Sequence, residues 1–293
     1  MQSLFKGKWT PFWLSLPMLF IVAMFFYLPI YLSFWWSFTL ERPFGGGSSF
    51  VGLQNYIRVL TDPVFWDSLW RTALFMVIGS SLAIAVPLVV ALAADRKVGM
   101  STFARNIMLW PKGISGASVG VVFSFIFNPF VGIFRSLNEL SPGLWQPGNH
   151  GTDAFITLLV AHVWSGIPFS FVILLSGLQA VPRDMIRAAA IDGASPWRRI
   201  WDIQLPMIAP QLFLTFVIEF TDSIVSVFSL IDTMTQGGPG GSTRLLVYKI
   251  YQDGFVGYDL SGAATQTVIL MVIVLALAAV QFLVIEKRVR YER

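Results

Sequence analysis

Long apolar segments alternate with shorter polar segments along the chain. Six of the apolar segments reach about 20 residues, the length that an α-helix needs to cross the hydrocarbon core of a bilayer. Helices suit lipid because they satisfy their backbone hydrogen bonds internally, and the sequence lacks the short alternating strands of a membrane barrel. The pattern therefore predicts an all-α, polytopic membrane protein. The six expected spans are residues 12–36, 72–94, 103–127, 154–178, 207–231 and 260–285.

The polar segments indicate how the spans are connected. In the loop 41–70, three consecutive glycines from Gly45 to Gly47 predict a flexible turn, and a short surface helix is expected to begin at Gly52. The short connection 95–102 predicts that the second and third spans are antiparallel neighbours. The predicted organisation is a first span with its outer loop (1–70), a membrane core (71–285) with an inserted polar loop (182–206), and a basic tail (286–293).

Composition narrows the class of protein further. Apolar residues make up 55% of the chain and charged residues only 12%, whereas soluble proteins average about 25% charged residues. Cysteine is absent, which excludes disulfides, thiolate metal sites and a cysteine nucleophile. Two histidines are too few for a metal centre made of histidine alone. We therefore predict no metal site and no catalytic residue.

The positive charges predict the orientation of the chain in the membrane. The formal net charge is +4, but Lys and Arg lie at the ends of the apolar segments and form no nucleic-acid-binding patch. They are most abundant on the side that holds both termini and the loop 182–210, so that side is expected to be cytoplasmic. Lys6 and Lys8 precede an apolar run of signal-peptide type, but the run is too long and lacks a small-residue cleavage site. It is interpreted as a retained first helix.

The loop 182–210 has more local structure than a simple connection requires. Residues 183–190 are good helix formers apart from Asp184 and Ile186, and they include three consecutive alanines, which leave a flat surface open to the backbone of another protein. Asp192 and Gly193 predict a turn, because Gly adopts positive φ readily. From these residues alone, the segment is either an ordinary cytoplasmic loop with interfacial helices or a docking site.

A second short helix is expected after this turn. Ser195 is a favourable N-cap and Pro196 suits the first helical position. Trp197, Ile200 and Trp201 recur at helical spacing and predict an apolar face that lies on the membrane surface. Pro206 and Pro210 then lead into the fifth span.

The run Ala188-Ala189-Ala190-Ile191-Asp192-Gly193-Ala194, followed by Ile203, Leu205-Pro206 and Pro210, resembles the EAA loop of permeases of binding-protein-dependent ABC importers. The resemblance implies a type I importer permease fold, in which this loop docks on a cytoplasmic ATPase subunit. One position departs from the motif, because Arg187 replaces its leading Glu and inverts a charge on the docking surface. The implied docking residues are Arg187, Ala188, Ala189, Ala190, Asp192, Gly193 and Ala194.

Further stretches resemble the carbohydrate-type members of that family. The run Thr-Gln-Gly-Gly-Pro at 235–239 and the run Tyr-Lys-Ile-Tyr at 248–251 are similar to their external loop before the last span. Together with Phe-Val-Gly-Leu-Gln-Asn at 50–55 and the ending Val-Arg-Tyr at 289–291, they resemble most the A-type permeases of sn-glycerol-3-phosphate importers. Gly237, Gly238 and Pro239 are either a contact with the binding protein or part of a plain loop.

This resemblance also implies partners and a location. A second permease subunit, two copies of an ATPase subunit and an extracytoplasmic substrate-binding protein are expected, together with membrane lipid. The chain itself is expected to hold no cofactor, since ATP and Mg would be bound by the ATPase. The location would be the bacterial cytoplasmic (inner) membrane, with both termini cytoplasmic.

Five residues inside the predicted spans are candidates for the substrate pathway. Lys112 is expected in the third span, where it either faces the pathway or extends toward the cytoplasmic interface. Glu219 and Asp222 share one side of the fifth span, as structural partners of Lys112 or of the second permease, or as ligands of a glycerol or choline-like group. His162 is a hydrogen-bonding residue between helices or a ligand, and Trp164 nearby would line a cavity.

The sequence also bears on two other classes of function. An ATPase is disfavoured because no Lys in the chain is followed by Ser or Thr, so the chain has no P-loop. An ion-coupled secondary transporter is the main alternative, since Glu219 and Asp222 could carry protons. An ABC permease for a plain sugar is a further alternative within the family.

Overall fold

The computed structural model describes residues 10–42, 45–96 and 109–285. Packing divides the chain into two units, Met1–Phe65 with Ile250–Ile273, and Trp66–Lys249 with Val274–Arg293. The predicted functional division, with its boundaries at 70 and 285, stays a prediction.

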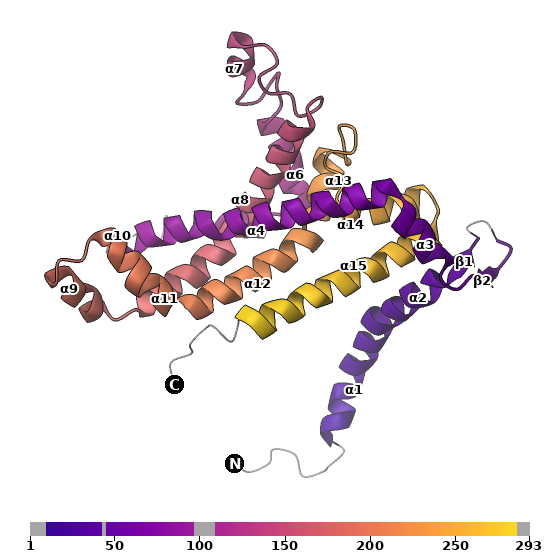
Figure 1. The fold of residues 1–293 in the computed structure, drawn as a ribbon, viewed down its shortest axis with the longest axis horizontal. Helices are drawn as coiled ribbons and strands as arrows, with labels where there is room; N and C mark the ends of the chain where they lie inside the picture. Colours follow the sequence, from indigo (N-terminus) through magenta and orange to yellow (C-terminus); the bar gives the residue numbers. More distant parts are fainter. Residues whose placement is uncertain (1–9, 43–44, 97–108, 286–293) are drawn as a thin grey trace. The chain divides into compact units, whose positions relative to one another are not determined.

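Helices account for most of the described residues (Figure 1). Five of the described helical segments are long and apolar enough to cross a membrane, and α6 (Gly116–Ile126) is a shorter apolar helix. Their positions confirm five of the predicted spans to within a few residues at most ends, although the second begins earlier than predicted. The five segments are Phe12–Ser37, Pro63–Asp95, Gly151–Ala180, Ala209–Met234 and Leu260–Leu283.

The first unit begins with one apolar helix and a small β-hairpin. The helix comprises α1 (Thr10–Val22), a π-helical turn η1 (Ala23–Tyr27) and α2 (Leu28–Ser37). The hairpin pairs β1 (Thr39–Glu41) with β2 (Ser48–Phe50) in antiparallel register and was not predicted. Its three glycines, predicted as a flexible turn, all adopt positive φ between the strands.

The rest of the first unit contains the predicted surface helix and part of the last span. The surface helix is α3 (Gln54–Thr61). The last span is formed by α15 (Leu260–Val280) with the π-helical turn η5 (Gln281–Ile285), and η4 (Gln252–Val256) precedes it. Only the part of this span up to Ile273 belongs to the first unit.

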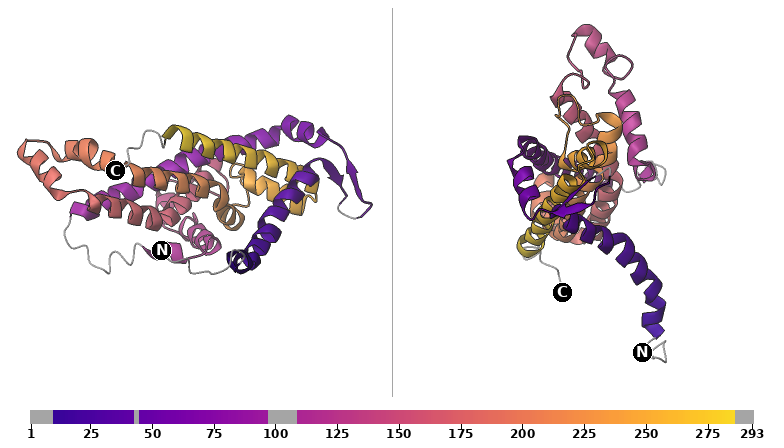
Figure 2. Two further views of the ribbon diagram at one scale, coloured as in Figure 1. Left: turned by 90° about the horizontal axis from the view of Figure 1, so that it is seen from below. Right: turned by 90° about the vertical axis from the view of Figure 1, so that its right-hand side faces the viewer.

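The second unit is built around three long helices. These are α4 (Pro63–Arg96), α8 (Gly151–Ala180) and α12 (Ala209–Val225), which continues beyond Ser226 as α13 (Val227–Met234). Figures 1 and 2 show a hairpin of short helices beyond the ends of these three helices. The hairpin comprises α9 (Arg183–Ile191), α10 (Pro196–Arg199), the π-helical turn η3 (Ile200–Gln204) and α11 (Leu205–Met207). The remaining short helices are α7 (Arg135–Leu140) and α14 (Leu246–Tyr251).

The third predicted span, 103–127, is wrong as a continuous helix over its described part. A 3₁₀ turn, η2 (Trp110–Gly113), is followed by extended backbone, and helix resumes only at α6. Pro111 lacks the backbone N–H needed to continue an α-helix, and Ser115 caps α6 by accepting a hydrogen bond from the N–H of Ser118 at 3.3 Å. Residues 103–108, and most of the predicted connection 95–102, lie outside the described residues.

One core cluster joins the hairpin of short helices to the long helices. Its centre is a row of fully buried side chains on α8, namely Phe171, Leu174 and Leu178. Ala91 of α4 and Ile208, which follows α11, complete the contact. Because packing rather than water exclusion holds helices together in lipid, this close fit fixes where the hairpin leaves the long helices.

Candidate functional site

The predicted docking helix exists as α9 and is largely exposed. Ala188 and Ala190 are exposed, Ala189 is half-buried, and Ile191 beside them is 87% exposed. On the side away from Ala188 and Ile191, Ile186 packs against the core cluster. The helix therefore packs on the protein through Ile186 and presents a flat, partly apolar surface outward. Sequence reasoning did not single out Ile191, although it lies within the motif.

The predicted turn after α9 is confirmed. Gly193 has φ of +81°, and the N–H of Ala194 donates to the carbonyl of Ala189 at 2.9 Å, which closes the helix. Asp192 is exposed at its C-cap. Ser195 caps α10 by accepting a hydrogen bond from the N–H of Arg198 at 3.3 Å. Local sequence alone is sufficient for this geometry, because glycine and a serine cap meet the backbone requirements.

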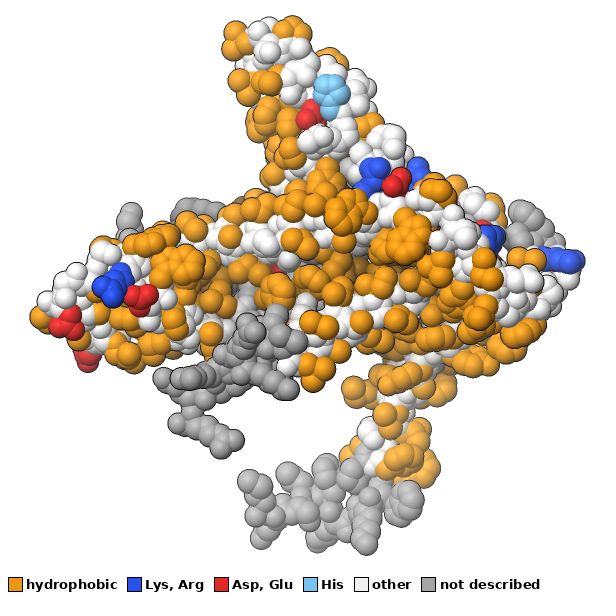
Figure 3. Space-filling view, in the orientation of Figure 1, with side chains coloured by type: hydrophobic (Ala, Val, Ile, Leu, Met, Phe, Trp, Pro, Cys, Tyr) orange, Lys and Arg blue, Asp and Glu red, His pale blue; other side chains and the backbone are white. Residues whose placement is uncertain are grey.

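The apolar face predicted for the second short helix is only partly confirmed. Trp197 and Trp201 are exposed and their rings meet edge to face, with centroids 5.7 Å apart. Ile200 is buried instead of sharing that face. The π-helical turn η3 begins at Ile200 and widens the helix there, so the spacing of an ordinary α-helix no longer applies. In Figure 3 charged side chains gather over α9 and α10, whereas hydrophobic side chains cover much of α4 and α12.

An ion pair fixes the start of α9 to the end of α4. The Nη1 and Nη2 atoms of Arg183 donate to the two carboxylate oxygens of Asp95 at 3.0 and 2.5 Å. The Asp95 side chain is 2% exposed and that of Arg183 is 47% exposed. Asp95 raises the pKa of Arg183, chiefly through the hydrogen bonds that it accepts. Sequence reasoning missed this pair, because no local signal connects residues 88 positions apart.

Arg187, the position that departs from the motif, also has a partner within α9. Its Nη1 lies 3.4 Å from Oδ1 of Asp184, and both side chains are highly exposed. Exposed pairs of this kind contribute at most about 1 kcal/mol. Arg187 is therefore readily available to a docking protein.

A polar cavity of about 290 Å³ lies at the breaks in two spans. One break is the segment between η2 and α6, and the other is at Ser226 between α12 and α13. Discontinuous helices free backbone polar groups within a membrane and often mark transport sites. The lining residues are Pro111, Lys112, Ile114, Gly116, His162, Ser165, Asp222, Ser226, Ser229 and Leu230.

Lys112 lines this cavity, but it does not lie inside a helical span as predicted. It occupies η2, and its Nζ lies 5.9 Å from the centroid of the Phe169 ring. Among the described residues Lys112 has no salt bridge within 4.0 Å, so the proposed pairing with Glu219 or Asp222 is not formed. Trp164 packs against Phe123 of α6, with ring centroids 5.4 Å apart, and does not line the cavity.

The two carboxylates of the fifth span have different surroundings. Asp222 faces the cavity and accepts a hydrogen bond from Ser226 Oγ at 2.6 Å. Glu219 is 2% exposed and points at α8, where Ser170 Oγ donates to its Oε1 at 2.5 Å. Its other oxygen, Oε2, has no hydrogen-bond partner and lies against Gly166, where an added Cβ would approach it to 2.9 Å. Glycine at this position leaves the space that the carboxyl group occupies.

His162 connects the same two helices. Its Nε2 lies 3.1 Å from Ser223 Oγ of α12, and its ring packs against Phe75 of α4. His162, Glu219 and Asp222 could each offer a ligand atom to a cation, since these atoms lie within 4.8 Å of one another. Each of the three already shares a hydrogen bond with a serine, so we interpret the group as a hydrogen-bonded cluster. The prediction of no metal site stays a prediction.

The predicted external contact is an ordered turn beside a second cavity. Thr243 is buried and its Oγ1 donates to the carbonyl of Gly238 at 2.8 Å, while Gly237 adopts φ of +80° against the Tyr248 ring. Gly238 and Pro239 line a cavity of about 490 Å³ together with residues of the α6–α8 connection. A contact of Gly237, Gly238 and Pro239 with a binding protein stays a prediction.

Comparison with known proteins gives a consistent result over nearly the whole chain. Residues 81–291 match the model of the family described as "Binding-protein-dependent transport system inner membrane component". The "sn-glycerol-3-phosphate transport system permease protein UgpA" of Brucella abortus is 40% identical over 287 residues, 98% of each chain. The protein of the same name from Rhizobium meliloti is 40% identical over 290 residues, 99% of each chain.

Solved structures support the same fold. A chain of a bacterial ABC transporter involved in the import of the acidic polysaccharide alginate superposes with a TM-score of 0.82 at 16% identity, over 97% of both chains. A chain of that transporter in complex with an alginate pentasaccharide-bound periplasmic protein gives 0.81, over 98% of this chain and 97% of the other. The likeness confirms the all-α importer permease fold that the sequence predicted.

Proposed function

Because the chain belongs to the family of inner membrane components of binding-protein-dependent transport systems, we propose that it is the permease subunit of an ATP-driven importer of sn-glycerol-3-phosphate or a related glycerophosphodiester. The observation that carries this proposal is 40% identity, over 98% of both chains, to a permease named for sn-glycerol-3-phosphate transport. The multi-pass pattern of apolar helices agrees with this assignment.

We propose that ATP hydrolysis is coupled to transport through α9. A separate ATPase subunit, present in two copies with ATP and Mg bound, would dock on the surface formed by Ala188, Ala190 and Ile191. The exposure of this surface supports the proposal, as does the turn at Gly193 that returns the chain toward α12. Arg187 would meet a carboxylate of the ATPase, since its charge is opposite to that of the usual Glu.

The substrate is proposed to pass the cavity at the two helix breaks. Lys112 would face the phosphate group, and Asp222 with Ser226 and Ser229 would accept or donate hydrogen bonds to hydroxyl groups. A volume of about 290 Å³ is at the lower end of the range for small-molecule sites, which suits a short polyol phosphate better than a sugar chain. Glu219 would act as a structural partner of α8.

The remaining subunits follow from the family. A second permease subunit would complete the pathway, and an extracytoplasmic binding protein would deliver the substrate at the turn that contains Gly237, Gly238 and Pro239. Both chain termini, the loop 182–206 and the ATPase would lie on the cytoplasmic side. The relative abundance of Lys and Arg on that side supports this topology.

Uptake into vesicles tests the proposed energy source. The complete transporter, reconstituted with its binding protein, should take up radiolabelled sn-glycerol-3-phosphate when ATP is supplied, even after an ionophore has collapsed the proton gradient. Uptake that requires the gradient and ignores ATP would identify an ion-coupled carrier instead. Strong inhibition by an unphosphorylated sugar, with none by glycerophosphocholine, would identify a sugar permease.

Lys112→Ala is expected to lower the maximal rate of uptake by about three- to tenfold. A charge-assisted hydrogen bond to phosphate contributes about 1.5–3 kcal/mol, and exposure of Lys112 to solvent reduces this value. Lys112→Arg should retain most of the rate, because it keeps the positive charge. Arg135→Ala, which removes an exposed cation of α7, is the matched control. An unchanged rate for Lys112→Ala would remove this residue from the pathway.

A further inference from the structure

The short helix α3 exposes a row of large aliphatic side chains. Its inward side carries Asn55 and Val59, both of which are buried. Its outward side carries three large aliphatic side chains, Leu53 immediately before the helix and Ile57 and Leu60 within it, which are 63%, 63% and 44% exposed. Their spacing of four and three residues places all three on one stripe. The stripe therefore points away from the protein that supports α3.

Polar contacts explain why this side faces outward. The Nδ2 of Asn55 donates to the carbonyl oxygens of Ser37 at 3.0 Å and of Thr39 at 2.9 Å, at the end of α2. The hydroxyl groups of Tyr56 and Ser37 are 2.9 Å apart. Rotating α3 to bury Ile57 would leave these groups without partners, which is costly for buried polar atoms. The orientation is thus determined by hydrogen bonds to the end of the first span.

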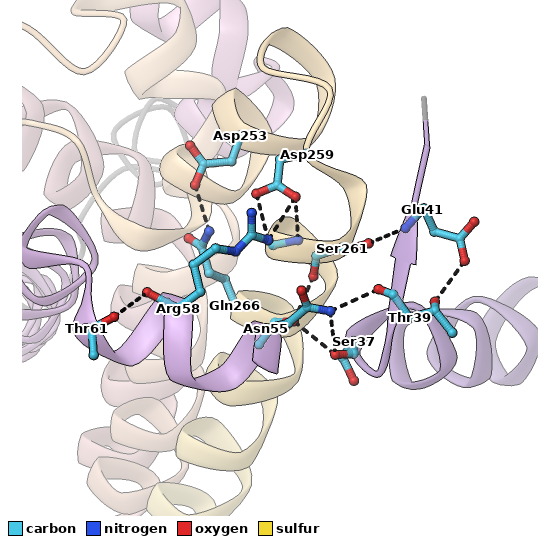
Figure 4. A network of polar contacts seen from close by, with 12 residues as sticks. Ser37, Thr39, Glu41, Asn55, Arg58, Thr61, Asp253, Asp259, Ser261 and Gln266 are labelled. Atoms are coloured by element: carbon cyan, nitrogen blue, oxygen red, sulfur yellow. Dashed lines mark hydrogen bonds and ion pairs between the residues drawn. The ribbon is translucent and has the colours of Figure 1, made fainter. Parts of the chain in front are cut away.

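A second set of contacts ties α3 to the start of the last span. Nη2 of Arg58 lies 3.0 Å from a carboxylate oxygen of Asp259, the residue immediately before α15. The N–H of Glu41 donates to Ser261 Oγ at 2.8 Å, which joins the neighbouring hairpin to the first turn of α15. Figure 4 shows α3 crossing α15 rather than running alongside it.

This placement locates α3 at the boundary of the bilayer. A helix that crosses a membrane-spanning helix near its end lies along the membrane surface. The helix has the composition of an interfacial helix, with Leu53, Ile57 and Leu60 on one exposed stripe and the exposed polar residues Gln54, Arg58 and Thr61 on the stripe beside it. Val64, on the first turn of α4 where the second span begins, is a further exposed aliphatic residue close to α3 in the chain.

From these observations we propose that the stripe Leu53–Ile57–Leu60 is embedded in the phospholipid of one leaflet, where α3 anchors the outer ends of the first and last spans. The three aliphatic side chains would lie at the boundary of the acyl chains, and Gln54 and Thr61 would lie in the headgroup layer. The inference goes beyond substrate transport and requires only that the spans cross a membrane. The proposed topology assigns the leaflet as the outer one.

The absence of cysteine makes a direct test possible, since single cysteines can be introduced without altering another residue. Nitroxide labels would be attached at Leu53→Cys, Ile57→Cys and Leu60→Cys, with Gln54→Cys and Thr61→Cys as matched controls on the polar side. The complete transporter would be reconstituted in vesicles of phosphatidylethanolamine and phosphatidylglycerol. Power-saturation measurements would then compare collision with oxygen, which partitions into lipid, and with a water-soluble nickel chelate.

The proposal expects a severalfold higher ratio of oxygen to nickel collisions at the three stripe positions than at the two controls. High nickel accessibility at the stripe would overturn it in favour of a water-exposed helix. Protection from both reagents would also overturn it, in favour of cover by the second permease or by the binding protein. Repeating the measurement without the binding protein separates these two cases. Because three positions report on one stripe, failure of one variant to assemble leaves the comparison intact.

Discussion

Arg183→Ala is expected to reduce ATP-driven uptake by about tenfold or more while the permease still inserts and assembles. The change leaves the Asp95 carboxylate, which is 2% exposed, without its cationic partner at the base of α9. Loss of one member of a fully buried pair costs about 3–5 kcal/mol. Because Arg183 is 47% exposed and water can replace part of it, we expect about 1–3 kcal/mol. The helix α9, on which the ATPase is proposed to dock, would no longer be fixed to α4.

The measurement compares uptake with ATP hydrolysis in the same vesicles. If Arg183→Ala retains ATP hydrolysis but loses uptake, the ATPase still docks on the permease but its movement no longer reaches the membrane helices. Arg183→Lys should give an intermediate result, because lysine keeps the charge but cannot form two parallel hydrogen bonds. Arg58→Ala removes a different, more exposed ion pair and serves as the control. Normal uptake by Arg183→Ala, or failure of Arg183→Lys to exceed it, would contradict this role.

Glu219→Ala is expected to abolish most uptake and to lower the stability of the assembled transporter. The substitution removes the acceptor of the short hydrogen bond from Ser170 and leaves a void between α8 and α12. An unpaired buried hydroxyl group and the void together cost about 2–4 kcal/mol. Uptake per amount of permease in the membrane and the temperature of thermal inactivation would both be measured.

Glu219→Gln distinguishes a structural role from a role of the charge. Its amide oxygen can still accept the hydrogen bond from Ser170, so uptake within about threefold of the native rate is expected, equivalent to less than about 1 kcal/mol. Asp222→Asn, which alters the carboxylate facing the cavity, should affect uptake without lowering thermal stability. A Gln variant as inactive as the Ala variant would show that Glu219 must ionise or exchange a proton.

The predictions that succeeded depend on neighbouring residues. The turn at Gly193 and the cap at Ser195 follow from backbone requirements that a few adjacent residues meet. The prediction of the third span was wrong, and that of the apolar face of α10 was only partly right, because local interruptions of the helix were not foreseen. Pro111 and the cap at Ser115 interrupt the third predicted span although its composition is apolar. The π-helical turn at Ile200 changed which side chain is buried.

The candidate site depends more on long-range packing. The sequence placed Glu219 and Asp222 on one side of a helix, but only the structure turned Asp222 to the cavity and Glu219 to Ser170. A helix that is apolar nearly all round carries little information about which side meets its neighbour. Small residues such as Gly166 decide this question by allowing a large side chain to approach closely.

The sequence by itself determined that this protein crosses the membrane several times, roughly where five of its spans lie, and that α9 ends in a tight turn. These features follow from the length of apolar runs and from local backbone preferences. Only the tertiary structure decided that Arg183 meets Asp95, that Lys112 faces a cavity, and that α3 turns its aliphatic side outward. Each of these depends on residues far apart in the chain, whose distance is fixed by the packing of whole helices.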